Sequence, residues 1–388
     1  MAAIIISLAL FIPYALLIIY YRKSWAAIPD FITNENHNHA SKISIIITAS
    51  NESANIIACI NSILNQTYDK SLFEIIVVDD FSTDDTAALV QSYPDPNVKL
   101  ISLKDYIPAG SINAYKKKAI ETGIQNASGD LIVTTDADCI VPNTWLQTIA
   151  TFYEKNNAAF IAMSVKYNCK NNFIEIFQAL DFMTLQGITG ASVYKKFNSM
   201  CNGANLAYSN KIFYEVDGFK GIDNIASGDD MLLMHKISQQ YIDKILFLKN
   251  NAVIVSTQPM PTVKSFFNQR IRWASTADKY DDKRIIIVLM LVYFFNVLLF
   301  VLPLITLFNN TYFSLFTFHF SLFTFWGMLI LSKTIVELIF LYPVAKFFNQ
   351  QKLLWWFPIA QPFHIVYTVI AGWLGKFGSY KWKERKVK

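Results

Sequence analysis

The stretch Leu131-Ile-Val-Thr-Thr-Asp-Ala-Asp138 places two carboxylates directly after a short run of apolar and β-branched residues. Runs of this length and composition, ended by polar residues, predict buried strands. Three similar runs precede it, and segments of helical pattern separate them. The predicted strands are Ile43–Thr48, Phe73–Val78, Val98–Leu103 and Leu131–Thr135, and the predicted helices lie at about 53–65, 84–92 and 111–126. This alternation predicts an α/β domain with a mostly parallel sheet flanked by helices.

Polar side chains stand where three of the predicted strands end. Thr48 ends the first strand, Asp80 follows the second, and Asp136-Ala-Asp138 follows the fourth. Ligands of open parallel sheets bind beyond the carboxyl ends of the strands. The sequence therefore predicts that these side chains share one ligand site at a single edge of the sheet.

Two acidic pairs have spacings that suit metal binding or general-base catalysis. Asp136 and Asp138 can hold a hard divalent ion such as Mg²⁺ or Mn²⁺, which takes oxygen ligands from both protein carboxylates and phosphate. Asp229 and Asp230 stand side by side in Ser227-Gly-Asp-Asp-Met231. Repulsion between adjacent carboxylates raises one pKa, which suits a general base. A helix N-terminus, whose dipole favours acidic residues, would also explain this location.

A fourth motif, Gln269-Arg-Ile-Arg-Trp273, follows these acidic positions in the chain. Three acidic stations followed by Gln-x-x-Arg-Trp resemble the family 2 membrane glycosyltransferases, which include the cellulose, chitin and hyaluronan synthases and the ceramide glucosyltransferases. The resemblance covers roughly residues 41–280. It implies a GT-A fold and an inverting transfer of a sugar from a UDP-sugar.

The resemblance assigns the donor side of the site. Asp80 would accept a hydrogen bond from the uracil or ribose, with Thr48 nearby. Asp138 would bind the Mg²⁺ or Mn²⁺ ion, and Asp136 would contact the ribose or support the metal. On a structural reading of the same turn, Ser82 or Thr83 would simply cap the next helix.

The resemblance also assigns the acceptor side. Asp230 would act as the general base that removes the acceptor hydroxyl proton, with Asp229 as its neighbour. Arg272 would contact the diphosphate through charge-assisted hydrogen bonds. Trp273 would form a wall of the acceptor site, and Gln269 would orient the group. Alternatively, this motif is an amphipathic interface helix anchored to lipid headgroups.

Three weaker matches accompany these motifs. Lys116 begins a segment that resembles a family lysine segment and is a candidate phosphate contact, although Glu121 replaces the usual asparagine. Cys201-Asn-Gly-Ala-Asn-Leu206 stands where relatives place an acceptor loop. Asp217-Gly-Phe219 resembles a Gly-Gly-Phe turn, and both of the latter segments could equally be ordinary turns.

Composition indicates that much of the chain lies in lipid. Its 388 residues are 53% hydrophobic and only 16% charged, whereas soluble domains carry about 25% charged residues. Ala2–Tyr21 is long and apolar enough to cross a bilayer. Positive charges follow it at Arg22 and Lys23, which predicts an outer N-terminus and a cytoplasmic catalytic domain. The net charge of +5 is small, and the basic residues beside apolar segments argue against nucleic-acid binding.

Further apolar segments follow the catalytic region. Ile285–Phe308 and Tyr312–Leu331 are predicted spans joined by an outer turn at Asn309–Thr311. Beyond them, Lys333 and Glu337 are four residues apart and could pair. We expect this pair at the inner interface, where a lysine side chain can extend to water, although a functional role inside the membrane is the alternative.

The last apolar segment, Leu353–Trp373, has two interpretations. It is long enough to span but contains Pro358, Gln361, Pro362 and His364. A fourth full span would put the basic tail outside, against the positive-inside rule. A re-entrant or interfacial segment would remove this conflict, and the sequence does not choose between them.

The sequence therefore predicts a multi-pass enzyme of the cell membrane. The expected regions are an anchor at 1–22, a linker at 23–41, a cytoplasmic GT-A domain at 42–281, a membrane region at 285–375 with two or three spans or re-entrant segments, and a basic tail at 376–388. The expected reaction is hexosyl transfer from a UDP-sugar to a lipid or lipid-linked glycan acceptor. A processive polysaccharide synthase, assembled as a homo-oligomer or with a partner, is the alternative.

Overall fold

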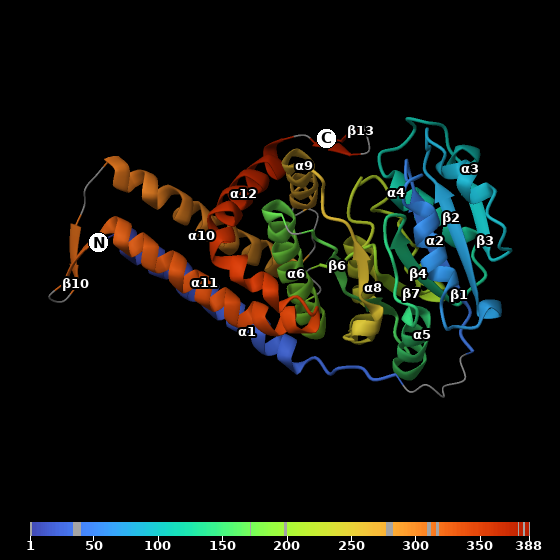
Figure 1. Cartoon of the computed structure of the whole chain (residues 1–388), viewed down its shortest axis with the longest axis horizontal. Coiled ribbons are helices and arrows are strands. Elements are labelled where there is room, and N and C mark those ends of the chain that lie inside the picture. Colours follow the sequence, from blue (N-terminus) through green and yellow to red (C-terminus); the bar gives the residue numbers. More distant parts are fainter. Residues whose placement is uncertain are drawn as a thin grey trace.

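The computed structural model describes residues 2–33, 40–170, 172–197, 200–276, 282–308, 312–315, 318–378, 380–382 and 385–387. The predicted outer turn at 309–311 lies outside the described residues, as does part of the predicted linker and of the basic tail. Figure 1 shows an α/β domain at one end of the molecule and long helices at the other.

Seven strands of the described chain form the central sheet, in the order β3-β2-β1-β4-β7-β5-β8. Their bounds are β1 (Ile43–Ala49), β2 (Phe73–Asp79), β3 (Val98–Ser102), β4 (Leu131–Asp136), β5 (Phe160–Ala162), β7 (Leu206–Ser209) and β8 (Ile245–Phe247). The sheet is mostly parallel, with β7 antiparallel to both of its neighbours. The predicted fold class and the four predicted strands are confirmed.

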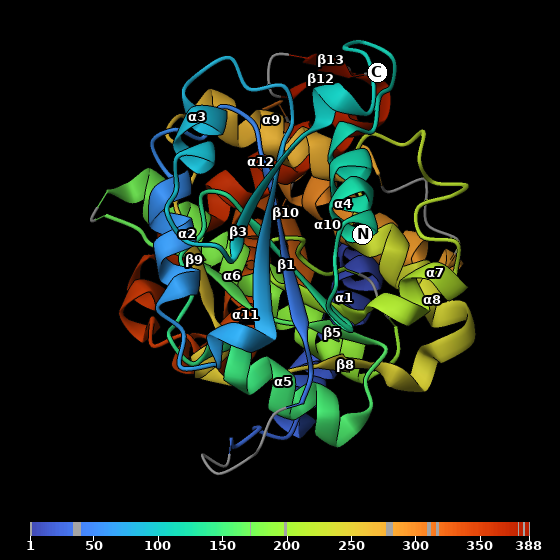
Figure 2. The same ribbon diagram turned by 90° about the vertical axis from the view of Figure 1, so that its right-hand side faces the viewer.

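Helices cover both faces of this sheet, which explains why its central strands β1, β2 and β4 are mostly apolar and buried. Successive side chains of β1 point to opposite faces, so Ile45 and Ile47 join one buried cluster and Ile46 joins the other. The first cluster includes α2 (Ile56–Leu64) and α5 (Trp145–Asn156), and the second includes α4 (Tyr115–Gln125). Figure 2 shows α2 and α4 on opposite sides of β1. The three predicted helices correspond to α2, α3 (Thr86–Gln91) and α4.

A second group of elements continues the domain towards the long helices. A small parallel sheet pairs β6 with β9. The elements are β6 (Val165–Tyr167), α6 (Phe173–Tyr194), α7 (Asn210–Glu215), α8 (Met231–Tyr241), β9 (Val255–Thr257) and α9 (Val263–Ala274), with short 3-10 turns η1 (Lys70–Leu72), η2 (Leu103–Asp105), η3 (Ile242–Lys244) and η4 (Asn251–Val253).

In the described part of the chain, four helical segments are long and apolar enough to cross a membrane. The helices are α1 (Ala2–Ala27), α10 (Lys283–Phe308), α11 (Leu322–Phe347) and α12 (Phe357–Phe377), the last preceded by η6 (Gln351–Trp356). Short hairpins follow α10 and α12: β10 (Tyr312–Leu315) with β11 (Phe318–Ser321), and β12 (Tyr380–Trp382) with β13 (Arg385–Val387). Figure 1 shows α1, α10 and α11 extending away from the α/β domain, whereas α12 stays between them and α9.

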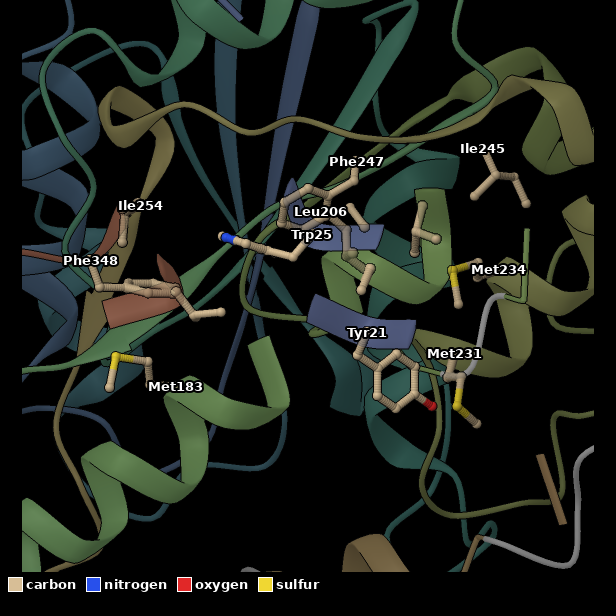
Figure 3. Packing of buried hydrophobic residues seen from close by; sticks show 14 of the residues in the cluster. Tyr21, Trp25, Met183, Leu206, Met231, Met234, Ile245, Phe247, Ile254 and Phe348 are labelled. Carbon is tan, nitrogen blue, oxygen red and sulfur yellow. The ribbon is translucent and has the colours of Figure 1, made fainter. Parts of the chain in front are cut away.

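The first helix is longer than predicted. It continues to Ala27, five residues past the predicted anchor at 1–22. Trp25, near its end, is buried and contacts Phe247 of β8 edge to face, with ring centroids 6.0 Å apart. Gly190 of α6 permits this approach, because a Cβ atom there would lie 2.7 Å from the Trp25 ring. Figure 3 shows this part of the core, where the end of α1 meets the strands.

The pair Lys333 and Glu337 on α11 forms as predicted, but its location differs. Lys333 is completely buried, and its Nζ donates to Glu337 at 2.8 Å and to Gln361 of α12 at 2.7 Å. Tyr14 of α1 also donates to Glu337. The expected lysine extending to water is therefore wrong, because partners on α11 and α12 satisfy the ammonium group inside the helix bundle.

Candidate active site

The strand register brings the predicted donor residues to one edge of the sheet. Thr48 of β1 lies opposite Val78 of β2 on one side and Asp136 of β4 on the other. Asp80, one residue past β2, is buried, and its N–H donates to the Ala49 carbonyl at 2.7 Å. The predicted clustering of Thr48, Asp80 and Asp136 at carboxyl strand ends is confirmed as a matter of geometry.

The turn after β2 is tied to the turn after β1. The Asn51 N–H donates to Ser82 Oγ at 3.0 Å, and the Thr83 N–H donates to Asn51 Oδ1 at 2.8 Å. Neither hydroxyl caps α3, whose N-cap is Asp85. The capping interpretation of Ser82 and Thr83 is therefore wrong, because these side chains join the two turns instead.

The acidic pair after β4 is suited to a divalent cation. Asp136 ends the strand, and Asp138 accepts a hydrogen bond from Thr257 at 3.1 Å. Burial, and then the charge of Asp136, raise the pKa of Asp138. A divalent cation between these carboxylates would relieve their repulsion, so the residues fit such an ion. Within the described residues no group of three or more His, Cys, Asp or Glu side chains could hold a metal.

Lys116 connects the two acidic motifs. Its Nζ on α4 lies 2.8 Å from Asp136 Oδ1 and 3.4 Å from Asp229 Oδ2. Burial disfavours the ammonium ion, but the charges of Asp136 and Asp229 outweigh this effect and raise the pKa of Lys116. The lysine therefore stays charged and holds carboxylates from two distant motifs in one cluster.

Asp230 occupies the N-terminus of α8. Its Oδ1 accepts from the Met231 N–H at 2.7 Å, and its Oδ2 accepts from the Gly203 N–H at 3.0 Å. The helix-terminus interpretation is thus correct for its location. Burial, and then the charge of Asp229, raise the pKa of Asp230 to about 6, against the opposing effect of Lys116. A carboxylate with this pKa can accept a proton near neutral pH.

The predicted acceptor loop lies beside this carboxylate. A Cβ atom at Gly203 would lie 3.0 Å from Asp229 Oδ2, so the loop backbone passes directly over the acidic pair. The turn at Asp217-Gly-Phe219 is different. Its first two residues have positive φ, and Lys236 donates to the Gly218 carbonyl at 2.7 Å. This second segment is a structural turn.

Sequence reasoning missed Lys117, the neighbour of Lys116. The Lys117 side chain is buried, and its Nζ donates to the carbonyls of Ile225 at 2.5 Å and Ser227 at 2.8 Å. Burial lowers its pKa to about 8, although the charges of nearby aspartates oppose the change. These bonds hold the loop that leads into Asp229, and the run of three lysines gave no sign of which one would turn inward.

The Gln-x-x-Arg-Trp motif lies on α9, a helix that begins with a capping box between Thr262 and Ser265. Arg272 faces the acidic motif, with its Nη1 3.4 Å from Ser227 Oγ. Gln269 Oε1 accepts from Arg270 Nη1 at 2.7 Å. The motif therefore lies against the loop that carries Asp229.

Arg270, to which the sequence assigned no role, organises this helix. It donates to Asp181 Oδ2 of α6 at 2.6 and 3.0 Å, and both side chains are buried. Its guanidinium lies 4.3 Å from the centre of the Trp273 ring. One face of Trp273 is thereby covered, and Phe182 of α6 also contacts the ring, with the two ring centroids 6.2 Å apart. A carboxylate at Asp181, in the middle of an apolar helix, was the available signal for this ion pair.

A groove of about 700 Å³ lies away from these residues. It is lined by Ser41, Ser128, Gly129, Asp130 and Asn210, at the start of β1 and β4. The acidic motifs follow the opposite ends of these strands. The groove is therefore separate from the candidate active site.

Comparisons with known proteins agree with this arrangement. Residues 44–217 match the family described as Glycosyl transferase family 2, and residues 131–330, more than half of the chain, match Glycosyl transferase family group 2. The chain belongs to glycosyltransferase family 2 and contains a GT-A fold.

Individual relatives are distant. Glycosyltransferase AglE of Haloferax volcanii is 26% identical over 198 residues, which are 49% of this chain and 59% of the relative. The probable glycosyltransferase YdaM of Bacillus subtilis is 26% identical over 250 residues, 62% of this chain and 56% of the relative. The chain thus matches less than two thirds of the length of these relatives. The mannosyltransferase PcManGT from Pyrobaculum calidifontis, solved with GDP-Man and Mn²⁺, is 18% identical with a TM-score of 0.56 and covers 94% of this chain and 97% of its own.

Proposed function

We propose that this membrane glycosyltransferase moves a hexose from a UDP-sugar, with inversion, to a lipid or lipid-linked acceptor. The observation that carries this proposal is the cluster in which Lys116 joins Asp136 of the donor motif to Asp229 of the base motif. An inverting transfer needs the leaving diphosphate on one side of the anomeric carbon and the acceptor base on the other. This cluster contains residues of both the donor motif and the base motif.

The donor would bind beyond the carboxyl ends of β1, β2 and β4. Asp80 and Thr48 would contact the nucleoside, and Asp136 and Asp138 would hold Mg²⁺ or Mn²⁺. The bound ion would neutralise charge that develops on the leaving diphosphate. Arg272, next to Ser227, would add charge-assisted hydrogen bonds to the same oxygens. The fold shared with a mannosyltransferase solved with GDP-Man and Mn²⁺ supports a nucleotide-sugar donor and a divalent ion.

Asp230 would act as the base. The acceptor hydroxyl oxygen forms a bond to the anomeric carbon, its proton moves to Asp230, and the bond from that carbon to the diphosphate oxygen breaks. With a pKa of about 6, the carboxylate is mostly ionised at neutral pH and accepts the proton readily. Gln269 and Trp273, held by Arg270, would line the acceptor side.

A single transfer is favoured over polysaccharide synthesis. The described residues contain four candidate membrane helices, which are few for enclosing a polymer channel within one chain. The catalytic domain would lie on the cytoplasmic side of the cell membrane, because Arg22 and Lys23 follow the apolar part of α1.

Product size tests this proposal. Purified protein in lipid would receive Mn²⁺, membrane lipid extract and a panel of labelled UDP-sugars, with GDP-mannose as an additional donor. We expect label in one organic-extractable species. Asp138→Ala should lose both this product and metal-dependent nucleotide binding. Asp230→Asn should lose the product but keep nucleotide binding. Label in long chains would show a polysaccharide synthase instead, and an active Asp230→Asn enzyme would exclude Asp230 as the base.

A further inference from the structure

Helix α12 differs from the other three long helices in its placement. We propose that α12 is a monotopic helix that lies in the plane of the membrane surface, on the side of the catalytic domain, with its aromatic face inserted among lipid headgroups and the adjoining acyl chains. Three independent features of the described residues carry this inference: the position of its two ends, the division of its side chains between two faces, and the direction of the other helices.

Both ends of the segment from η6 to α12 contact the catalytic domain. Immediately before η6, Gln350 Nε2 donates to the Tyr167 carbonyl of β6 at 3.3 Å. At its end, Gly375 packs so tightly on α9 that a Cβ atom there would lie 2.6 Å from the Ala274 Cβ. A 21-residue helix is about 32 Å long, which matches the hydrocarbon thickness of about 30 Å. A helix that crossed the bilayer would place one of these ends on the far side, away from the domain.

The two faces of this segment have different compositions. The buried residues of α12, which face the protein, are Phe357, Ala360, Gln361, Ile365, Ala371 and Gly375. Large apolar residues, between 38% and 85% exposed, face outward, most of them at spacings of three or four: Trp355, Trp356, Ile359, Phe363, Val366, Ile370, Trp373, Leu374 and Phe377. Tryptophans at both ends of an exposed apolar face are typical of helices at a lipid interface. Exposed lysines flank this face at Lys352 and Lys376, where they can reach phosphate headgroups.

The remaining helices run in a different direction. Figure 1 shows the N-terminus of α1 and the β10 hairpin between α10 and α11 at the end of the molecule remote from the α/β domain, with α12 close to that domain. Three spans and one in-plane helix place β12 and β13, which carry basic residues, on the catalytic side. This arrangement satisfies the positive-inside rule, which a fourth span would violate.

The in-plane position has a consequence for catalysis that rests on the proposed function. Ala371 packs on Ile271 of the motif helix, and Tyr367 donates to Asp181, the partner of Arg270. Lipid headgroups at α12 would therefore lie about one helix diameter, or roughly 10 Å, from the motif helix α9. A lipid-linked acceptor could present its reacting hydroxyl there without leaving the bilayer.

Site-directed labelling of the full-length protein in sealed vesicles tests the topology without any need for activity. The background is Cys169→Ser/Cys201→Ser, because the other two cysteines are buried. Three variants each carry one new cysteine, in place of Lys352, Lys376 or the exposed Lys211. The cysteine at position 211 reports the catalytic side. A membrane-impermeant maleimide should label all three from the same side. Labelling of positions 352 and 376 from opposite sides would overturn the proposal.

Depth measurement provides the second readout. Trp355→Cys and Phe363→Cys carry bimane in vesicles that contain lipids brominated close to the headgroup or deep in the chain. Shallow bromines should quench both labels more strongly than deep ones. Quenching of Phe363→Cys mainly by deep bromines would indicate a spanning helix. Absence of quenching at both positions would show that protein or water, and not lipid, covers this face; either result refutes the in-plane placement.

Discussion

The titration of Asp230 should set the acid limb of the pH–rate profile. Burial and the neighbouring charge of Asp229 raise its pKa to about 6. A base with this pKa is about nine-tenths ionised at pH 7, half at pH 6 and about one-tenth at pH 5, whereas an ordinary aspartate with a pKa of about 3.9 would stay more than nine-tenths ionised at pH 5. Between pH 7 and pH 5, kcat/KM should therefore fall about tenfold.

The assay is an initial-rate measurement of label transfer at fixed ionic strength from pH 4.5 to pH 8. Asp138 also has a raised pKa, so its protonation must be separated from that of Asp230. Protons compete with a metal ion for Asp138, and a limb from this residue would move to lower pH as Mn²⁺ is increased. A limb from Asp230 would stay in place.

Asp229→Asn provides the matched variant. It removes the charge that helps to raise the pKa of Asp230 while keeping the size of the side chain, so the limb should shift to lower pH. A wild-type profile that is flat down to pH 5, or a limb that Asp229→Asn leaves unmoved, would refute the assignment of Asp230 as the titrating base.

Three further perturbations test the surroundings of the site. Lys117→Met removes two charge-assisted bonds to the loop before Asp229 and should lower kcat/KM about tenfold or more; Lys117→Arg should recover part of the loss, and equal activity of all three proteins would contradict a positioning role. Asp181→Ala leaves Arg270 buried without its counter-charge and should cost about 3–5 kcal/mol in the free energy of unfolding, measured by thermal unfolding in detergent. As the matched control, Glu121→Gln in the partly exposed pair with Lys118 should cost at most about 1 kcal/mol. Equal losses of unfolding free energy in the two variants would contradict a stabilising role for the buried pair. Gly190→Ala should lower the unfolding midpoint because its Cβ would meet Trp25 at 2.7 Å, whereas Gly327→Ala, with open space around it, should not.

The sequence by itself determined the central sheet and the positions of the acidic motifs along it. Three of its strands, β1, β2 and β4, are mostly apolar and almost wholly buried, because parallel strands covered on both faces bury nearly every side chain. The fourth, β3, lies at the sheet edge and is only partly buried. The bounds of these four strands in the structure differ from the prediction by no more than one residue at either end. The carboxylates at the ends of β2 and β4 lie at the same edge of the sheet for the same local reason, since these parallel strands both pair with β1 and end at one edge.

The sequence did not predict in which direction individual side chains point. Successive residues of an α-helix are rotated by about 100°, so Arg270 and Arg272 point to nearly opposite sides of α9. Only the packing of α6 and of the acidic loop decided that Arg270 binds Asp181 and that Arg272 faces Ser227. The same applies to Lys116 and Lys117 on α4, of which one binds two carboxylates and the other holds a loop.

The tertiary structure also decided the relations between distant segments. Nothing local to Asp136 or Asp229 indicates that one lysine ammonium would lie between them. Likewise, the length and hydropathy of α12 are compatible with a span. Its position against the catalytic domain follows instead from two contacts: Gln350, just before η6, with β6, and Gly375 with α9. Such contacts join residues far apart in the chain, and their energies depend on packing that no local sequence pattern encodes.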